Sequence, residues 1–333
     1  MYKAEENRYD SMTYRRVGKS GLKLPEVSLG LWHNFGTYDN YGEMEKICLT
    51  AFDAGVTHFD LANNYGPVPG SAETHFGQIL KEQLGAYRDE LIISTKAGYS
   101  MWKGPYGDFG SRKYLIASLD QSLKRMGLEY VDIFYHHRMD PDTPLEETMG
   151  ALDQIVRSGK ALYVGISNYD GPTLERAAAI LKEMKTPFVI NQNRYNILDR
   201  TIEQNGLKKT AAESGKGIIA YSPLCQGLLS DRYLNGIPDD SRMNRKQGHL
   251  METGLPEDTL SRLKKLDAIA KERGESLARM ALAWILKDDD VCSVLVGASR
   301  AEQLKENLKV LNRQPFTAEE LKKIDEISEG YIF

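Results

Sequence analysis

Residues that can hold or move a proton stand at short intervals in the first half of the sequence. Asp60 and Tyr65 lie in the segment FDLANNYG, Lys96 ends IISTK, and His136 and His137 end YVDIFYHH. Reduction of a carbonyl compound needs a hydride and a proton, and a phenol such as Tyr65 can deliver the proton to the developing alkoxide. These residue types therefore suit proton transfer in carbonyl reduction.

A neighbouring cation would change the pKa of the Tyr65 phenol. The pKa of a free tyrosine is near 10, which is high for a group that must both give and take a proton. An ammonium about 4 Å away contributes up to about 4 kcal/mol at an effective dielectric near 20, so we expect Lys96 to lower the pKa of Tyr65. The carboxylate of Asp60 would keep Lys96 charged despite burial. A neutral imidazole would orient the substrate oxygen.

Chemistry alone does not choose between the two histidines, because neighbouring strand residues point to opposite faces. Taken singly, the aspartate, lysine and tyrosine also fit ordinary turn, surface and packing roles. Their joint position after three consecutive strands favours catalysis. The double histidine has no carboxylate or thiolate at ligand spacing beside it, so we expect no metal site.

The elements that must position these residues alternate regularly. Eight short apolar segments predict strands at 27–31, 57–61, 91–96, 131–137, 163–166, 188–192, 217–221 and 291–296. Amphipathic segments predict helices at 43–54, 73–84, 112–126, 145–157, 173–184, 203–214, 277–286 and 302–310. Eight such units predict an α/β fold, the (β/α)₈ TIM barrel, with its active site at the C-terminal ends of the strands.

Other segments lie outside this repeat. Residues 14–24 predict an N-terminal hairpin that closes the bottom of the barrel. The polar segment 227–254 predicts a long functional loop on the top face. Additional helices are expected at 256–273 and 318–328, the second across the outside. With no linker in the sequence, we expect one domain over residues 1–333.

Composition narrows the class of protein. The chain has 333 residues and a formal net charge of −4, and it has no long basic segment, so nucleic acid is not an expected partner. Without a signal peptide or an apolar segment of spanning length, we expect no membrane association and a cytoplasmic location. Cys48, Cys225 and Cys292 are expected to be buried small side chains and not a disulfide or metal site.

Several segments resemble the signatures of the aldo-keto reductases. They are FDLANNYG, STK, GISN, INQNRYN, AYSPL, GLLSDRY and SVLVGASRAEQLKENL, in that family's order and over nearly the whole chain. The resemblance implies an NADP(H)-dependent reductase with a catalytic group formed by Tyr65, Lys96, Asp60 and His137. It gives His136 a position that the family usually fills with an apolar residue.

The resemblance also implies a cofactor site held by the loops of the barrel, since the chain has no GxGxxG after a strand. Ser167, Asn168 and Gln192 would hold the carboxamide, and Tyr221 would stack on the nicotinamide ring. The pyrophosphate would lie near Ser222, Pro223, Leu224, Gly227, Leu228, Arg232 and Arg242. The ribose phosphate would lie near Gly297, Ser299, Arg300 and Gln303, and the adenine near Glu306 and Asn307. A phosphate at this helix N-terminus favours NADPH over NADH.

Aromatic residues after the first and third predicted strands would wall a substrate pocket, although packing roles fit them equally well. They are Trp32, which also belongs to the implied cofactor set, with His33, Tyr99 and Trp102. Lys103 or Arg138 would bind a substrate phosphate.

Three longer segments most resemble the subgroup of bacterial L-glyceraldehyde 3-phosphate reductases and potassium-channel β subunits. They begin ANNYGPVPGSAE, RMDPDTPLEETMG and GLLSDRYLNG. This resemblance implies small aldehyde substrates, such as methylglyoxal and L-glyceraldehyde 3-phosphate, and homo-oligomers, as tetramers or octamers.

Two other functions remain open. One is a cofactor-occupied regulatory subunit that senses redox state, although the channel subunits carry Asn where this chain has His137. The other is a barrel aldolase with a Schiff base on Lys96, which leaves Tyr221 and the segment after the eighth strand without a role.

Overall fold

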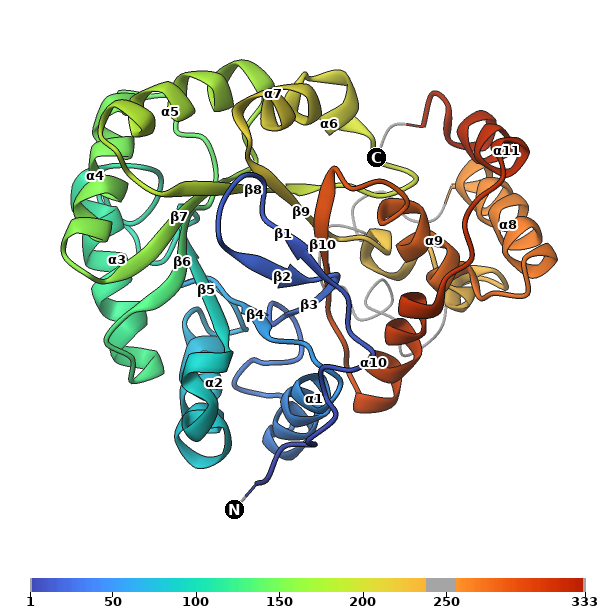
Figure 1. Ribbon diagram of the computed structural model, residues 1–333, viewed down its shortest axis with the longest axis horizontal. Coiled ribbons are helices and arrows are strands. Elements are labelled where there is room, and N and C mark those ends of the chain that lie inside the picture. Colours follow the sequence, from blue (N-terminus) through green and yellow to red (C-terminus); the bar gives the residue numbers. More distant parts are fainter. Residues whose placement is uncertain (1, 238–255, 332–333) are drawn as a thin grey trace.

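The computed structural model describes residues 2–237 and 256–331 of the chain (Figure 1). Eight parallel strands close into a barrel in the order β10-β3-β4-β5-β6-β7-β8-β9. They are β3 (Val27–Gly30), β4 (His58–Asp60), β5 (Ile92–Ala97), β6 (Val131–His136), β7 (Ala161–Ser167), β8 (Phe188–Arg194), β9 (Gly217–Tyr221) and β10 (Val291–Val296). The predicted (β/α)₈ TIM barrel is confirmed.

Helices surround the barrel (Figure 1). They are α1 (Tyr41–Asp53), α2 (Ser71–Ile79), α3 (Arg112–Met126), α4 (Leu145–Arg157), α5 (Gly171–Glu183), α6 (Thr201–Gln204), α7 (Leu207–Ser214), α8 (Glu257–Glu272), α9 (Leu277–Ile285), α10 (Ala301–Leu308) and α11 (Ala318–Ser328). Side-chain caps begin several of them, because the first N–H groups of a helix need acceptors. Ser111 accepts from Tyr114 at α3, and Thr317 forms a capping box with Glu320 at α11.

Two predicted helices differ in detail from the structure. The segment 203–214 forms two helices, α6 and α7, because Gly206 has φ of +80° and breaks the helical path between them. The segment 73–84 begins earlier, at Ser71, and its last turn is a π-helix, η1 (Leu80–Leu84). A 3₁₀ helix, η2 (Gly85–Glu90), follows it. The expected additional helices are present as α8 and α11.

An antiparallel hairpin closes the N-terminal end of the barrel, as predicted. Its strands β1 (Tyr14–Arg16) and β2 (Lys23–Pro25) lie across the ring of parallel strands in Figure 1. Val17 and Leu24 of the hairpin are fully buried in one cluster with Tyr135 of β6. The amide of Lys19 donates to the carbonyl of Gly215, just before β9, at 2.9 Å. The C-terminal ends of the strands, where the candidate residues stand, lie at the opposite end.

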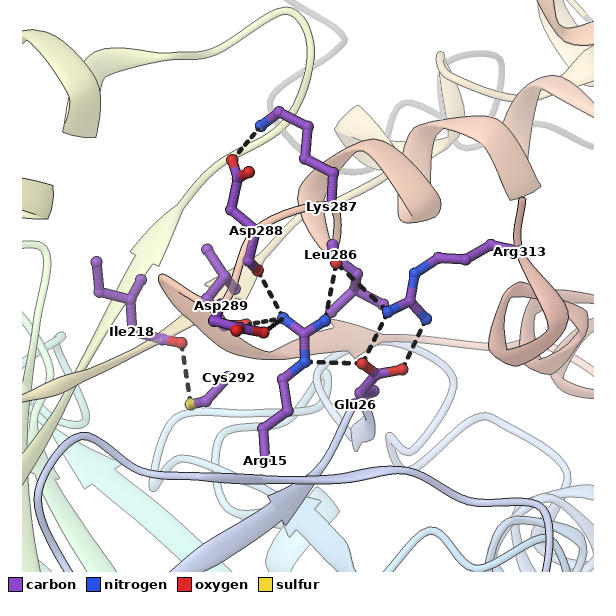
Figure 2. Close-up of polar contacts among 10 residues, drawn as sticks. Arg15, Glu26, Ile218, Leu286, Lys287, Asp288, Asp289, Cys292 and Arg313 are labelled. Atoms are coloured by element: carbon purple, nitrogen blue, oxygen red, sulfur yellow. Dashed lines mark hydrogen bonds and ion pairs between the residues drawn. The ribbon is translucent and has the colours of Figure 1, made fainter. Parts of the chain in front are cut away.

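A buried carboxylate joins distant parts of the chain at the same end (Figure 2). Glu26, immediately before β3, is 2% exposed and accepts from Arg15 at 2.7 Å. Both terminal nitrogens of Arg313 donate to it, at 2.7 and 2.8 Å. Arg15 also donates to the backbone oxygens of Leu286, Asp288 and Val291. We call Arg15, Glu26 and Arg313 the basal clamp, because they tie the hairpin, β3, the turn before β10 and the C-terminal segment together.

The three cysteines, Cys48, Cys225 and Cys292, are buried and free, as expected for small core side chains. No described helix has the length and apolar character needed to cross a lipid bilayer.

Candidate active site

A buried ion pair lies at the C-terminal ends of two neighbouring strands. Asp60 ends β4, and Lys96 lies near the end of β5. The ammonium of Lys96 donates to Oδ2 of Asp60 at 2.5 Å and to the carbonyl of Leu61 at 2.7 Å. Both side chains are almost inaccessible to solvent. Burial lowers the pKa of Lys96, and the charge and hydrogen bond of Asp60 act in the opposite direction.

Tyr65 extends from the loop after β4 to this pair. The Lys96 ammonium lies 4.9 Å from the centre of the Tyr65 ring, facing the ring while its hydrogen bonds go to Asp60 and Leu61. Burial raises the pKa of Tyr65 well above 10, and Asp60, Tyr221 and Tyr99 act in the same direction. The expected net lowering of this pKa is therefore wrong, because burial is the dominant cause and the Asp60 carboxylate acts in the same direction as burial. Tyr65 keeps its proton at neutral pH, the form that a proton donor needs.

The structure distinguishes the two histidines. His137 follows β6, and its ring lies edge-on to Tyr65 at 5.8 Å and to Tyr99 at 4.6 Å between ring centres. Burial, with the charges of Lys96 and neighbouring groups, lowers the pKa of His137 well below 6.5, so its imidazole is neutral. His136 points to the opposite face, where Nδ1 lies 2.7 Å from the Tyr169 hydroxyl. His137 is therefore the histidine in the candidate site.

The residues expected around the carboxamide lie beside this group. Asn168 follows β7 with φ of +59° and donates to the carbonyl of His137 at 3.0 Å and to Oγ of Ser167 at 3.3 Å. The hydroxyl of Tyr221, at the end of β9, donates to Oδ1 of Asn168 at 2.8 Å. Gln192 of β8 donates to Oδ1 of Asp60 at 3.1 Å. Hydrogen bonds thus connect all four residues with the catalytic candidates.

The residues expected near the pyrophosphate follow β9 in a tightly turned segment. Positive φ values recur at Ser222, Cys225, Gln226 and Gly227, and Asn196 donates to the carbonyl of Ser222 at 3.0 Å. Ser222, Leu224 and Gly227 are partly exposed, Pro223 and Leu228 are buried, and Arg232 is exposed in the 3₁₀ helix η4 (Asp231–Tyr233). Arg242 lies outside the described residues.

The last predicted group lies just before α10 and along it. Gly297, Ser299, Arg300 and Gln303 are exposed there, and Glu306 is exposed and paired with Lys309 at 2.6 Å. The amide and hydroxyl of Ser299 donate to Oε1 of Gln303 at 3.0 and 3.2 Å. The first amide of the helix, that of Ala301, donates to Glu43 at 2.9 Å, so this donor is already used.

Asn307 provides a test of whether this group fits a bound cofactor. The residue is 4% exposed, and its Nδ2 is buried without a hydrogen-bond partner among the described residues. Buried amide donors are rarely left unpaired. An acceptor on a ligand such as adenine would satisfy it, so these residues fit the nicotinamide dinucleotide that the sequence implies.

Aromatic side chains border the catalytic candidates. The Trp32 ring stacks on Tyr65 with 6.0 Å between centres, close to His33. Tyr99 lies against His137, whereas Trp102 packs on Tyr114.

Of the two cations expected to bind a substrate phosphate, Lys103 is exposed. Arg138 lies beside the aromatic rings, 4.6 Å from the centre of Tyr99 and 4.0 Å from that of Phe109. It also donates to the carbonyl of Gly98 at 2.9 Å and pairs with Asp108 at 3.5 Å.

Two polar residues below Asp60 were missed by the sequence interpretation. Ser94 donates to Oδ1 of Asp60 at 2.7 Å, and His58 lies 2.9 Å from Ser94. Each stands two residues before a catalytic candidate on the same strand, and this period places it on the same face. That spacing was the available signal. The described residues contain no cluster of His, Cys, Asp or Glu suited to a metal ion.

Comparisons with known proteins agree with this geometry. The family model described as the aldo/keto reductase family matches residues 26–329. Over 333 residues the chain is 57% identical to L-glyceraldehyde 3-phosphate reductase of Escherichia coli (strain K12), covering 99% of this chain and 96% of the relative. It is 37% identical to a putative voltage-gated potassium channel subunit beta of Schizosaccharomyces pombe, over 95% of this chain and 93% of the relative. A probable voltage-gated potassium channel subunit beta of Arabidopsis thaliana is 36% identical, over 95% of this chain and 96% of the relative.

Proposed function

Because the chain belongs to the aldo/keto reductase family and is an oxidoreductase, we propose that it reduces small aldehydes with NADPH, using Tyr65 as proton donor. L-Glyceraldehyde 3-phosphate is the first candidate substrate, and methylglyoxal is a second. The observation that carries the proposal is the buried group of Asp60, Lys96, Tyr65 and His137 at the C-terminal ends of neighbouring strands.

In the proposed reaction, bound NADPH would be the source of the hydride for the carbonyl carbon. Tyr65 donates its proton to the carbonyl oxygen, which leaves an alcohol and a phenolate. The Lys96 ammonium, 4.9 Å from the ring centre, stabilises the phenolate that forms, and Asp60 keeps the ammonium charged. The neutral imidazole of His137 hydrogen-bonds the substrate oxygen and orients it.

Proposed cofactor contacts follow the same rim of the barrel. Ser167, Asn168 and Gln192 would hold the carboxamide, and the Tyr221 ring would pack on the nicotinamide, which selects the face that delivers hydride. The orphaned Nδ2 of Asn307 supports adenine near α10. The preference for NADPH rests on Arg300, an exposed guanidinium at the start of this helix, since guanidinium groups bind phosphate well.

The phosphorylated substrate is favoured by a cation close to the proposed reaction centre. Arg138 follows His137 directly, and the rings of Tyr99 and Phe109 hold its guanidinium in place. A fixed guanidinium suits recognition of a phosphate monoester. The name of the 57% identical relative points to the same substrate.

The direct test is NADPH oxidation by the purified protein with L-glyceraldehyde 3-phosphate, methylglyoxal, glyceraldehyde and an aromatic aldehyde. We expect the highest kcat/KM with the triose phosphate. An Arg138→Met variant should lose this preference, with a smaller effect on unphosphorylated glyceraldehyde. Absence of NADPH oxidation with every aldehyde would refute the proposed function.

A regulatory subunit with a bound cofactor is a second candidate, favoured by the 37% identity to a channel-subunit relative. Single-turnover and steady-state rates separate the two. A regulatory protein would oxidise bound NADPH once and then turn over slowly, whereas the proposed reductase would turn over repeatedly. A neutral imidazole at position 137 beside Tyr65 favours the reductase.

A cytoplasmic location and assembly into tetramers or octamers also remain proposals. Light scattering on the purified protein would measure the oligomeric state.

A further inference from the structure

A continuous line of polar side chains crosses the barrel interior below Asp60. It passes from Asp60 to Ser94 at 2.7 Å, from Ser94 to His58 Nε2 at 2.9 Å, and from His58 Nδ1 to Ser28 at 2.9 Å. Ser28 in turn lies 2.6 Å from Ser293. The four residues below Asp60 come from the neighbouring strands β10, β3, β4 and β5, and each is fully buried.

The carboxylate at the upper end determines which atoms donate. An ionised carboxylate can only accept hydrogen bonds, and Asp60 is paired with the Lys96 ammonium through its other oxygen. The single hydroxyl proton of Ser94 therefore points to Asp60. Ser94 must then accept from Nε2 of His58, which requires a proton on that nitrogen.

The remaining protons follow from this assignment. Burial lowers the pKa of His58 to about 4, so the imidazole is neutral and carries one proton. With that proton on Nε2, Nδ1 must accept from Ser28. Ser28 then accepts from Ser293, whose other contact, to the carbonyl of Glu26, is long at 3.4 Å.

The reverse direction of donation, away from Asp60, is unfavourable at the carboxylate. It would place the lone pairs of Ser94 against a carboxylate oxygen at 2.7 Å without a proton between them. A buried acceptor without a hydrogen-bond donor keeps the full free-energy cost of its desolvation. Hydrogen bonds to charged groups are also stronger than those between neutral groups. The line therefore has one favoured direction, with every donor pointing toward Asp60.

We propose that His58 is a positioning residue for the reductase, held as the Nε2–H tautomer so that Ser94 donates to Asp60 and fixes the carboxylate that binds Lys96. The kinetic part of this inference rests on the proposed function. The tautomer is a property of the folded protein alone. Without the Ser94 donor, the carboxylate is held less firmly and stabilises the Lys96 charge less, so kcat falls while KM changes little.

The first test is the tautomer in the unaltered protein. Nitrogen NMR of protein labelled with ¹⁵N-histidine distinguishes protonated from bare ring nitrogens, and His58→Gln assigns the signal by its loss. We expect a protonated Nε2 and a bare Nδ1 at neutral pH. A proton on Nδ1, alone or together with Nε2, would overturn the proposal, and this result does not depend on any activity.

The second test compares His58→Gln with His58→Leu. A glutamine amide can replace Nε2 as the donor to Ser94, whereas leucine cannot. We expect His58→Leu to lower kcat about tenfold, equivalent to about 1.4 kcal/mol, with KM within about twofold. His58→Gln should keep most of the activity. Ser94→Ala is a smaller change that removes the donor to Asp60 directly. It should lower kcat to a similar extent, and it tests the proposal even if His58→Leu does not fold.

A matched control is His136→Leu, which removes another buried, neutral strand histidine that is bonded to Tyr169 and not to this line. We expect its kcat to stay within about twofold of wild type. Equal kcat in wild type, His58→Leu and Ser94→Ala would overturn the inference, as would equal losses in His58→Leu and His136→Leu. If the wild type reduces no aldehyde, the proposed function fails, and the NMR result still decides the tautomer.

Discussion

At the scale of single residues, the site holds a phenol that is kept protonated and is still close to a cation. Burial raises the pKa of Tyr65, and the Lys96 ammonium lies 4.9 Å from the centre of its ring. This arrangement suits reduction, since the donor carries its proton throughout the neutral range. In the proposed reaction, the ammonium of Lys96 would stabilise the phenolate that remains after the proton has left.

Replacement of Tyr65 tests its role as proton donor. Tyr65→Phe keeps the ring beside Trp32 and Lys96, so NADPH affinity, measured by fluorescence titration, should not change. The reduction rate should fall by roughly 10² to 10⁴, the usual effect of losing a general acid. Turnover equal to wild type would exclude Tyr65 from the mechanism.

The directions of the pKa shifts also predict a pH profile. His137 has a lowered pKa and stays neutral above it, and Tyr65 has a raised pKa and stays protonated below it. Reductive kcat should therefore be flat from about pH 6 to 8, without a step near the usual histidine pKa of about 6.5. A sigmoidal change centred there would contradict the assignment of a neutral His137.

Lys96→Met should change the reverse reaction most. Alcohol oxidation needs the phenolate of Tyr65, and loss of the cation raises the phenol pKa further. The alkaline rise of the oxidation rate should move to higher pH, and the rate at pH 8 should fall. A profile that superimposes on that of wild type would show that Lys96 does not act on Tyr65.

The catalytic candidates were predictable because each is a conspicuous residue type at the end of a strand. His58 and Ser94 were not, although alternation places them on the same face. A sequence gives the period of a strand but not the register of its neighbours, so it did not show that these side chains meet. The pKa of Tyr65 also depends on burial, which the sequence does not quantify.

At the scale of elements, α2 and α3 approach closely at a glycine. A Cβ on Gly77 would lie 2.7 Å from Cα and 2.8 Å from the carbonyl oxygen of Met126, both backbone atoms. Because backbone cannot move aside as a side chain can, the helices require glycine here. α2 follows the loop that carries Tyr65, and the amide of Ala72 in its first turn donates to the carbonyl of Tyr65 at 3.3 Å.

Alanine at position 77 should therefore reverse the usual helix preference. Gly→Ala in a helix interior normally stabilises by about 0.5–1 kcal/mol. Gly77→Ala should instead destabilise by about 1–3 kcal/mol through overpacking, as measured by urea unfolding. Gly150→Ala in α4 is the control, because its Cβ would meet only the flexible end of Arg112. Stabilisation at both positions would argue against the close contact.

Most elements were predictable from hydrophobic periodicity, since parallel strands buried on both faces form short apolar segments. All eight barrel strands lie within a few residues of their predicted bounds. The break at Gly206 and the π-helix at Leu80–Leu84 were not predicted, because each depends on tertiary packing or on one backbone angle that periodicity does not report.

At the scale of the whole molecule, the ion pairs of the basal clamp and the candidate active site lie at opposite ends of the barrel. The basal clamp holds the N-terminal end, and the candidate site occupies the other. Changes to the clamp should therefore alter folding without altering kcat per folded molecule.

Glu26→Gln tests this separation. Removing the charge leaves Arg15 and Arg313 facing a neutral amide, and breaking a buried ion pair costs on the order of 3 kcal/mol. Chemical unfolding should show this loss, while kcat corrected for folded protein stays unchanged. Glu302→Gln breaks an exposed pair with Lys46 and should change stability much less, because solvent screens such pairs. Equal effects of the two variants would show that the clamp adds little.

The same carboxylate predicts acid sensitivity. Burial by itself raises the pKa of Glu26, but Arg313 and Arg15 outweigh it, and the net shift is downward from 4.5. A carboxylate whose pKa is lower in the folded than in the unfolded state stabilises the folded protein. This contribution is fully present above the unfolded pKa and is lost as the pH falls through the folded pKa. Below about pH 4.5 the wild type should therefore lose more stability than Glu26→Gln.

The basal clamp joins residues that are synthesised at very different times. Glu26 and Arg313 are 287 residues apart, so nearly the entire chain is translated before the second arginine emerges. Until then the carboxylate has Arg15 alone as a cationic partner in the clamp. The base of the nascent barrel is therefore expected to stay without this second cationic contact until the segment that carries Arg313 has been synthesised.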